Sequence, residues 1–417
     1  MRSWDVASPV EGAVHRAYEQ EWGYVLAAAA RVAADLDLAE DCVQDAYAQA
    51  LVHWRSHGVP RRPGAWLTTV ATRRALEQRR RADTLRRKLP LLVPDEGVRD
   101  EPETVFPDDR LRLVFTCCHP ALSREAQVAL TLRLVCGVSG GEIARAFLIK
   151  EATVQARITR AKRKIAGARI PYRVPGPADL PHRVEAVLDV VHLVYTGGHT
   201  ATSGTDLMRA DLAHRGLDLA RMMHRLLPGV GEVRGLLALL VLTQARSAAR
   251  TDRDGRLVLL GDQDRTLWDR DAIGEGLELV RGALARPPAG RFALMAAIAA
   301  VHAEAPTWVD TDWPQILGLY DLLLARWPSP VVALNRAVAV SHAHGTEAGL
   351  AAIAELAVEP GLASYPYLAA TRAELLRRAG DRAGAVVAYE EALLLTDNQV
   401  EADHLARRLA GLRAGRG

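Results

Sequence analysis

The chain has 417 residues, of which 49% are hydrophobic and 25% charged, a composition typical of a soluble globular protein long enough for two or three compact units. Its start, MRSWDVASPVEG, lacks the apolar core of a signal peptide, and no apolar run approaches the roughly 20 residues of a membrane span, so we expect a cytoplasmic protein without membrane contact. The net charge of +3 is uneven, because residues 1–173 hold 28 Lys and Arg against 21 Asp and Glu, whereas residues 174–417 hold 25 against 29. A polyanion-binding surface is therefore expected in the first part of the chain.

Apolar residues at helical spacing predict two helices at the start of the chain. The first covers residues 10–34, and the second follows from Leu38 to Trp54. One side of the second helix is acidic and polar, and it carries Glu40, Asp41, Gln44 and Asp45. Such a face is usually only solvated, but it also suits a basic partner surface.

A strongly basic segment lies between Arg61 and Lys88, where ten Lys or Arg are opposed only by Glu77 and Asp83. Neutralising several phosphates with these cations would make nucleic-acid binding strongly salt-dependent. Trp66 stands at the head of this predicted helix. It could stack on an unpaired base, although a Trp at a helix start more often belongs to the core.

The next segment, residues 91–109, holds seven acidic residues, one Arg and three prolines, and it predicts a flexible acidic linker. The segment from Arg110 to Leu134 is expected to be helical again.

Residues 139–165 have the pattern of a helix-turn-helix with a basic second helix. Ser139 and Glu142 predict a capping box at its start. An apolar stripe follows the second helix, formed by Val154, Ile158, Ala161 and Ile165. Seven polar residues are predicted to face away from that stripe: Thr153, Gln155, Arg157, Arg160, Lys162, Arg163 and Lys164. Such groups can meet base edges in a major groove while flanking cations meet phosphates; the alternative is a helical corner with a solvated basic face.

The second half of the chain is helical by pattern, so the whole protein is predicted to be all-α. Two of its segments look alike, and Arg336 of one aligns with Arg372 of the other. Their spacing is close to the repeat length of tetratricopeptide proteins, which is about 34 residues. Stacked helix pairs of that kind would leave a concave surface for a peptide or protein. The alternative is a helical bundle with accidental similarity.

No residue pattern predicts catalysis or metal binding. Cys117, Cys118 and His119 are adjacent, which favours buried thiols over a tetrahedral zinc site. Asp252 and Asp254 lack the further ligands of a calcium loop and favour a turn with a short hairpin. We therefore predict neither an enzyme nor a protein with a cofactor or metal.

The order of these features resembles the extracytoplasmic-function (ECF) group of bacterial sigma-70 factors. AEDCVQDAYAQAL, PGAWLTTVATRRAL and GEIARAFLIKEATVQARITRAKRKI are similar to its regions 2.2, 2.3 to 2.4 and 4.2. DDRLRLVFTCCHPALSREAQVALTLRL resembles the branch with a C-terminal extension of tetratricopeptide type. The resemblance implies sigma region 2 at residues 10–90, the acidic linker at 91–109, sigma region 4 at 110–173 and the tetratricopeptide-like extension at 181–417.

The resemblance also implies roles for matching positions. Docking on core RNA polymerase would use Glu40, Asp41, Gln44 and Asp45. The opened −10 element would lie along Trp66, Thr69, Arg73, Arg74 and Gln78, with a flipped base held by the loop 54–64. The −35 element would be read by Thr153, Gln155, Arg157 and Arg160, with Lys162, Arg163 and Lys164 on phosphates. Leu148 departs from the Gly that many such turns contain, and it predicts a wider turn.

These implications predict a sigma factor that directs core RNA polymerase to −35/−10 promoter DNA. The extension would control its activity in place of a membrane anti-sigma factor, and it could bind a small regulatory protein or peptide. Two alternatives stay open. One is a helix-turn-helix transcriptional regulator with a tetratricopeptide sensor that does not act through core polymerase. The other is an interaction scaffold whose basic helices bind acidic proteins.

Overall fold

The computed structural model describes residues 9–88, 108–147, 149–200, 204, 207–285 and 287–415, without the side chains of residues 82, 83 and 85–88. The chain divides into two compact units, an N-terminal unit of residues 1–190 and a C-terminal unit of residues 191–417. Leu148 and residues 91–107 of the expected linker lie outside the described residues, so what the sequence predicts for them stays a prediction.

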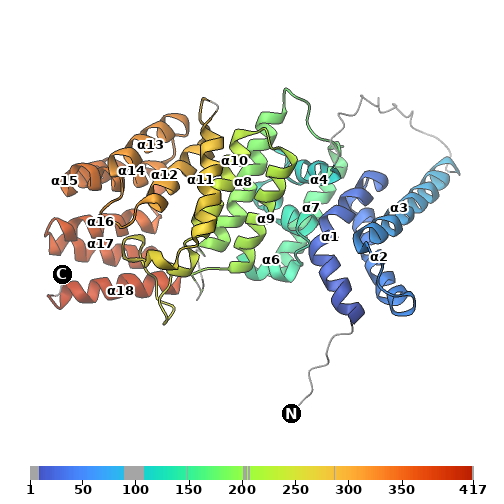
Figure 1. Cartoon of the computed structure of the whole chain (residues 1–417), viewed down its shortest axis with the longest axis horizontal. Coiled ribbons are helices and arrows are strands. Elements are labelled where there is room, and N and C mark those ends of the chain that lie inside the picture. The colour runs from blue at the N-terminus through green and yellow to red at the C-terminus, as the bar shows by residue number, and fades with distance from the viewer. Residues whose placement is uncertain are drawn as a thin grey trace, which may run out of the picture. The chain divides into compact units, whose positions relative to one another are not determined.

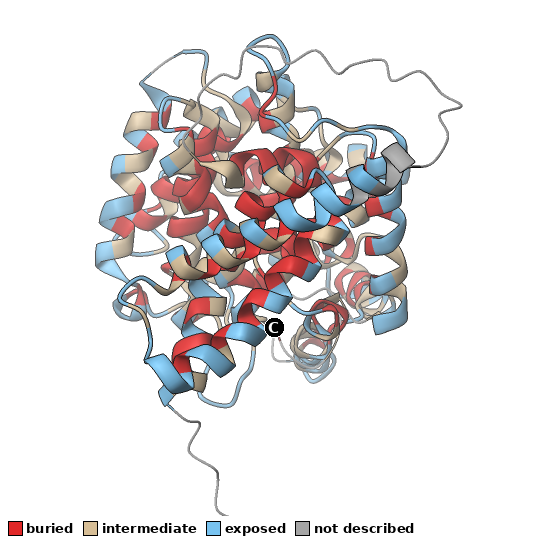
Figure 2. Cartoon of the chain, turned by 90° about the vertical axis from the view of Figure 1, so that its right-hand side faces the viewer, coloured by how far each residue is buried: buried red, intermediate tan, exposed pale blue. Residues whose placement is uncertain are grey.

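The N-terminal unit is built from helices (Figure 1), which are α1 (Pro9–Ala33), α2 (Leu36–His57), α3 (Pro63–Lys88), α4 (Asp109–Cys117), α5 (Arg124–Leu130), the π-helix η1 (Thr131–Val135), α6 (Gly140–Phe147), α7 (Glu151–Gly167) and the first half of α8 (Leu180–His199). Helices α1, α2 and α3 pack on one another, and Trp22, Trp54 and Leu67 are almost fully buried there. Figure 2 shows the buried inner sides and exposed outer sides of such helices, the amphipathic arrangement that the spacing predicts.

Side-chain caps explain where several of these helices begin. Asp35 Oδ1 accepts the Leu38 N–H at 2.8 Å at the start of α2, and Ser123 caps α5 in the same way. At the other end of α2 the chain turns at Gly58, whose φ of +80° favours glycine.

The segment from Arg110 to Leu134, predicted to be helical, is interrupted. Helix α4 ends at Cys117, and α5 begins only at Arg124. Pro120 has no N–H to donate, and the Ser123 side chain caps a new helix, so both residues favour an interruption here.

The C-terminal unit continues with the second half of α8 and ten further α-helices: α9 (Ala210–Leu226), α10 (Gly231–Gln244), α11 (Arg270–Leu284), α12 (Arg291–Glu304), α13 (Trp313–Arg326), α14 (Pro330–His344), α15 (Thr346–Leu356), α16 (Pro366–Arg378), α17 (Arg382–Leu395) and α18 (Gln399–Arg413). Short 3₁₀ segments are η2 (Ser247–Ala249), η3 (Leu260–Asp262), η4 (Arg265–Leu267) and η5 (Pro360–Leu362). The described residues form only two isolated β-bridges and no strand, so the all-α prediction is confirmed.

Successive helices of the C-terminal unit pack pairwise, α13 on α14, α14 on α15, α16 on α17 and α17 on α18. Four residues of the two similar segments are buried, as close helix packing in such a repeat requires, namely Ala337, Ala373, Ala388 and Tyr389. The predicted turn at Asp252 is also present, because its Oδ1 accepts the N–H groups of Asp254 and Arg256 at 2.9 and 2.8 Å. Thr251 and Leu257 pair across this turn.

Candidate nucleic-acid interface

The helix-turn-helix begins at a reciprocal cap. The Ser139 N–H donates to Glu142 Oε2 at 2.8 Å, and the Glu142 N–H donates to Ser139 Oγ at 3.2 Å. These bonds are the predicted capping box, and α6 starts at the next residue, Gly140. Ile143 and Ala144 of α6 are buried against the rest of the unit.

Helix α7 carries the apolar stripe that the spacing predicts. The four residues of the stripe are buried: Val154, Ile158, Ala161 and Ile165. Four of the selected polar residues are exposed: Gln155, Arg160, Arg163 and Lys164. Thr153 and Arg157 are half-buried. The helix therefore presents to solvent an amide and three cations, groups that can bind base edges and phosphates.

Lys162 does not belong to that exposed face. Its side chain is 8% exposed, and Nζ donates to Asp37 Oδ1 and to Glu40 Oε2, both at 2.7 Å. Burial acts to lower the pKa of Lys162, but the hydrogen bonds to the two carboxylates outweigh it, so the pKa is raised and the ammonium form is held. The prediction that Lys162 faces away from the stripe is wrong, because it stands four residues after Ile158 and therefore on the same side of α7.

Glu40 is likewise not part of an exposed acidic face, and that prediction is also wrong in this structure. Its buried carboxylate lies between Lys162 and Arg133, and both cations pair with it. Glu40 follows Leu36 by four residues and precedes Val43 by three, and both are buried, so it lies on the inner side of α2. The remaining residues of the predicted face are exposed, Asp41, Gln44 and Asp45.

Arg133 of η1 is a further member of this group of paired charges, and the sequence does not predict its role. Besides pairing with Glu40, its guanidinium lies over the Trp22 ring, 5.8 Å from the centroid. We call Lys162, Arg133, Glu40 and Asp37 the ion network. No local spacing signal marks Arg133, since its partners are far away in the sequence.

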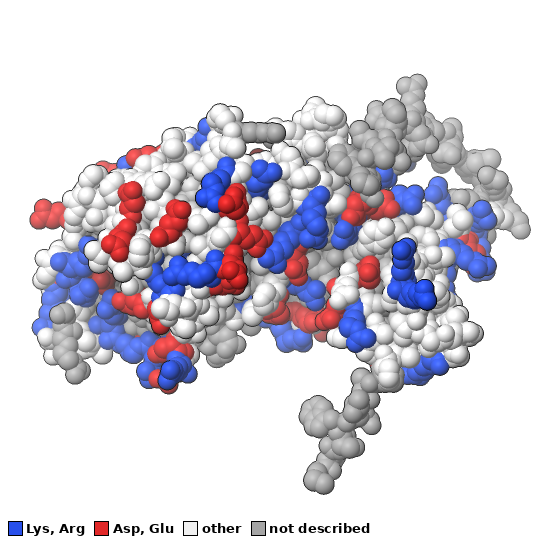
Figure 3. Space-filling view, in the orientation of Figure 1, with Lys and Arg blue, Asp and Glu red and all other residues white. Residues whose placement is uncertain are grey.

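On α3, Thr69, Arg73 and Gln78 are exposed, as the assignment to a DNA surface requires. Arg74 forms an ion pair with Asp45 of α2, which links two residues assigned to different partners. Lys and Arg predominate on the surface over α3 (Figure 3).

Trp66 is half-buried at the start of α3. Its ring lies edge-on to Trp54, with 5.6 Å between the ring centroids, so the core holds one side of it. Helix α2 continues to His57 and α3 starts at Pro63, so the loop beside Trp66 is shorter than the expected 54–64.

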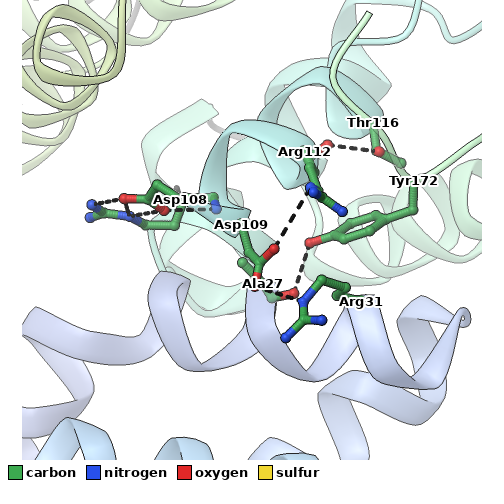
Figure 4. A network of polar contacts seen from close by, with 8 residues as sticks. Ala27, Arg31, Asp108, Asp109, Arg112, Thr116 and Tyr172 are labelled. Atoms are coloured by element: carbon green, nitrogen blue, oxygen red, sulfur yellow. Dashed lines mark hydrogen bonds and ion pairs between the residues drawn. The ribbon is translucent and has the colours of Figure 1, made fainter. Parts of the chain in front are cut away.

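A second polar network joins α1 to α4 and to Tyr172 (Figure 4). Asp109 accepts a hydrogen bond from Arg31 Nε at 3.0 Å and lies 3.7 Å from Arg112 Nε. The Tyr172 hydroxyl donates to the Ala27 carbonyl at 3.0 Å. Asp109, at the end of the expected linker, is thus the first residue of α4 and bonds to α1.

Tight packing supports the same contact between the first three helices and the helix-turn-helix part. The Tyr18 hydroxyl donates to the Gly137 carbonyl at 2.9 Å. Gly137 has φ +69°, and a Cβ there would lie 2.9 Å from the Trp22 ring, so both backbone and space favour glycine. In this structure the N-terminal unit is therefore closed, with α7 held against α2.

Other candidate sites behave as structural groups. Cys117 and Cys118 are buried, and burial raises the pKa of both thiols, that of Cys118 to about 11. Within the described ranges, no three His, Cys, Asp or Glu side chains are grouped so that they could hold a metal ion. None of the helices in the described part of the chain combines the length and apolarity needed to span a membrane.

Known protein families match segments of both units of the chain. Residues 17–84 match the family model for sigma-70 region 2, and residues 112–165 match the model for sigma-70 region 4. Residues 183–284 match a family of unknown function, DUF6596. The chain is also 40% identical over 391 residues to an uncharacterized protein of Rhizobium meliloti (strain 1021), with 91% of each chain covered. With region 2 on α1 to α3 and region 4 on α4 to α7, the chain belongs to the sigma-70 family of RNA polymerase sigma factors.

Proposed function

We propose that this chain is a sigma factor of the ECF type that recognises a −35 element with α7 and a −10 element with α3. The observation that carries the proposal is the exposed polar face of α7. Gln155 and Arg160 stand on it beside Arg163 and Lys164, opposite a buried apolar stripe. Amide and guanidinium groups discriminate bases in the major groove, and the flanking cations neutralise phosphates.

For the −10 element, the proposal assigns the exposed side of α3 around Thr69, Arg73 and Gln78. The exposed part of the half-buried Trp66 ring would stack on an unpaired base, since aromatic side chains beside cations bind single strands. Arg74 would join this surface when its pair with Asp45 is released.

For core RNA polymerase, the proposal assigns Asp41, Gln44 and Asp45 of α2, which are exposed. Glu40 and Lys162 would be available to polymerase and DNA only after the ion network separates, because they are now paired with each other.

The closed unit cannot bind both promoter elements at once. Elements centred near −35 and −10 are about 25 base pairs apart, on the order of 80 Å at about 3.4 Å per base pair. Lys162 of α7 and Glu40 of α2 are only 2.7 Å apart. The segment of residues 89–107 could span roughly 65 Å when extended, so it is long enough to let the two parts separate. We therefore infer that opening of this interface accompanies binding to core polymerase and promoter.

The C-terminal unit is proposed to be a tetratricopeptide-like regulatory extension. Its pairwise helix packing and the buried Ala337, Ala373 and Tyr389 support a repeat of this kind. A truncation that tests its role should keep residues 1–190. Arg183 donates to the Phe115 carbonyl and Arg124 pairs with Asp189, so a cut near residue 175 would remove contacts inside the N-terminal unit.

Run-off transcription with purified core RNA polymerase on candidate promoters tests the proposal. We expect a specific transcript with the full chain and altered output with residues 1–190. Specific DNA binding without any polymerase-dependent transcript would instead favour the helix-turn-helix regulator that acts without core contact. Unchanged output after truncation would contradict the regulatory role of the extension.

A further inference from the structure

The C-terminal unit contains a cavity that the sigma assignment does not use. It has a volume of about 350 Å³ and lies among α14, α16, α17 and α18, with Leu257 and Leu259 of the preceding loop on its wall. This size is within the range of small-molecule sites.

Two apolar clusters meet at this cavity. One joins Leu334 and Leu375, and the other includes Tyr389 and Leu405. Helix α16 belongs to both, because Leu375 lies in the first cluster and Ala373 in the second. The wall is therefore largely apolar, which favours a ligand with an apolar body.

The carboxylates that line the cavity already accept hydrogen bonds from other side chains of the protein. Glu374 accepts hydrogen bonds from Arg377 at 2.7 and 3.1 Å and from the Tyr389 hydroxyl at 3.0 Å, and it also lies 3.4 Å from Arg408. Glu401 accepts the Tyr367 hydroxyl at 2.8 Å. Neither carboxylate is left to bind a cationic ligand on its own.

Arg378 is not part of these ion pairs and hydrogen bonds. It is exposed at the end of α16, lines the cavity, and makes no hydrogen bond or ion pair with another described residue. Of the two arginines on the wall, Arg408 lies against Glu374, which Arg377 also binds, so Arg378 is the wall arginine that no described carboxylate pairs with.

Two histidines beside these arginines offer further polar contacts. His342 is stacked on Trp313 with 4.0 Å between ring centroids, and neither its ring nor that of His404 hydrogen-bonds within the described residues. Burial first, and then the nearby Arg378, lowers the pKa of His342 to about 4, so at neutral pH its ring is uncharged and can donate one hydrogen bond and accept another.

We propose that this cavity binds a small amphipathic carboxylate, with its carboxylate on Arg378 and His342 and its apolar body against Leu259, Val338 and Leu405. Arg378 lines the cavity and is exposed, so it lies where the cavity meets solvent. The proposal does not depend on promoter recognition, since binding can be measured on the protein alone.

Calorimetry on the full chain with decanoate tests the proposal, and decanol serves as the matched uncharged probe. We expect one decanoate per chain and weaker binding of decanol. Arg378→Gln should weaken decanoate about tenfold, the loss of one charge-assisted contact, and leave decanol unchanged. Arg326→Gln, a change of an exposed cation at the end of α13, should have no effect on either probe.

A second variant, Ala370→Trp, places a large ring in the cavity and should abolish binding of both probes. Circular dichroism would show whether it is folded, while Arg378→Gln lies at the surface and keeps the test independent of that result. Absence of decanoate binding at 1 mM, equal affinity in Arg378→Gln, or several equivalent sites per chain would each overturn the proposal.

Discussion

Lys162 has two possible roles that substitution can tell apart: binding a DNA phosphate or holding the N-terminal unit closed. If it binds a phosphate, its removal weakens DNA binding and reduces the slope of affinity against salt by about one. If it holds the closed unit, its removal leaves Glu40 with Arg133 alone and Asp37 without a partner in the ion network. The 2.7 Å contacts to both carboxylates favour the second mechanism in the free protein.

We predict that Lys162→Gln destabilises the closed unit. Breaking a buried pair costs about 3–5 kcal/mol, and the lower end applies here because Arg133 remains beside Glu40 and Asp37 is exposed. Distances between spin labels on α3 and α7 should therefore shift toward longer values. Lys164→Gln is the matched control, since its side chain is exposed on the same helix.

DNA binding provides the opposing readout for the same two variants. Without core polymerase, Lys164→Gln should reduce the slope of DNA affinity against salt, and Lys162→Gln should leave it unchanged, because the ion network holds Lys162 away from DNA in the closed unit. A reduced slope for Lys162→Gln together with unchanged label distances would show that the ion network does not hold the unit closed.

At the scale of the element, α7 divides its exposed residues between base recognition and phosphate binding. Gln155 lies in the first half of the helix, and Arg160, near its middle, precedes Arg163 and Lys164. In helix-turn-helix proteins the first part of the recognition helix contacts base edges. The two pairs should therefore differ in what their removal changes.

We predict that Gln155→Ala or Arg160→Ala lowers affinity for a preferred −35 sequence by about 1–3 kcal/mol and reduces discrimination against single-base changes. Lys164→Ala should weaken preferred and random DNA equally. Competition binding at several salt concentrations measures both effects. Equal losses on preferred and random DNA for Gln155→Ala would remove it from the base-reading set.

The same element shows what sequence reasoning could predict. The apolar spacing predicts the buried face of α7, and Ser139 with Glu142 predicts the cap of the preceding helix α6. Both features depend on residues within one or two turns of each other. The four-residue distance from Ile158 to Lys162 places the Lys162 side chain on the buried side of α7, although its charge alone favours the solvent side. The break at Pro120 was also visible in the sequence and was missed.

For the whole molecule, the sequence predicted the order of parts and the fold class but not the closed arrangement. Contacts such as Tyr172 with Ala27 and Arg133 with Glu40 join residues far apart in the chain. A buried ion pair needs both partners, and local periodicity identifies neither. The cavity beside Arg378 was missed for the same reason, since its wall comes from α14, α16, α17, α18 and a distant loop.

Buried histidines make the C-terminal unit sensitive to acid. Burial first, and nearby arginines second, lower the pKa of His199 to about 3 and those of His302 and His342 to about 4. An unfolded histidine has a pKa of about 6.5. Below that value the unfolded chain binds protons that the folded unit does not, so stability is complete above about pH 6.5 and falls as the pH drops toward 4.

We predict a loss of about 1–2 kcal/mol per histidine between pH 7 and pH 5, measured by urea unfolding of the full chain. Glu401, whose pKa is raised by burial, acts in the opposite direction and reduces the total at the acid end. His302→Phe should shrink the pH dependence by about one proton, because a neutral ring between Trp308 and Trp313 has nothing to titrate. His344→Gln, at the exposed end of α14, controls for the substitution itself. If His302→Phe retained the full pH dependence, the proton uptake would have to lie outside this aromatic cluster.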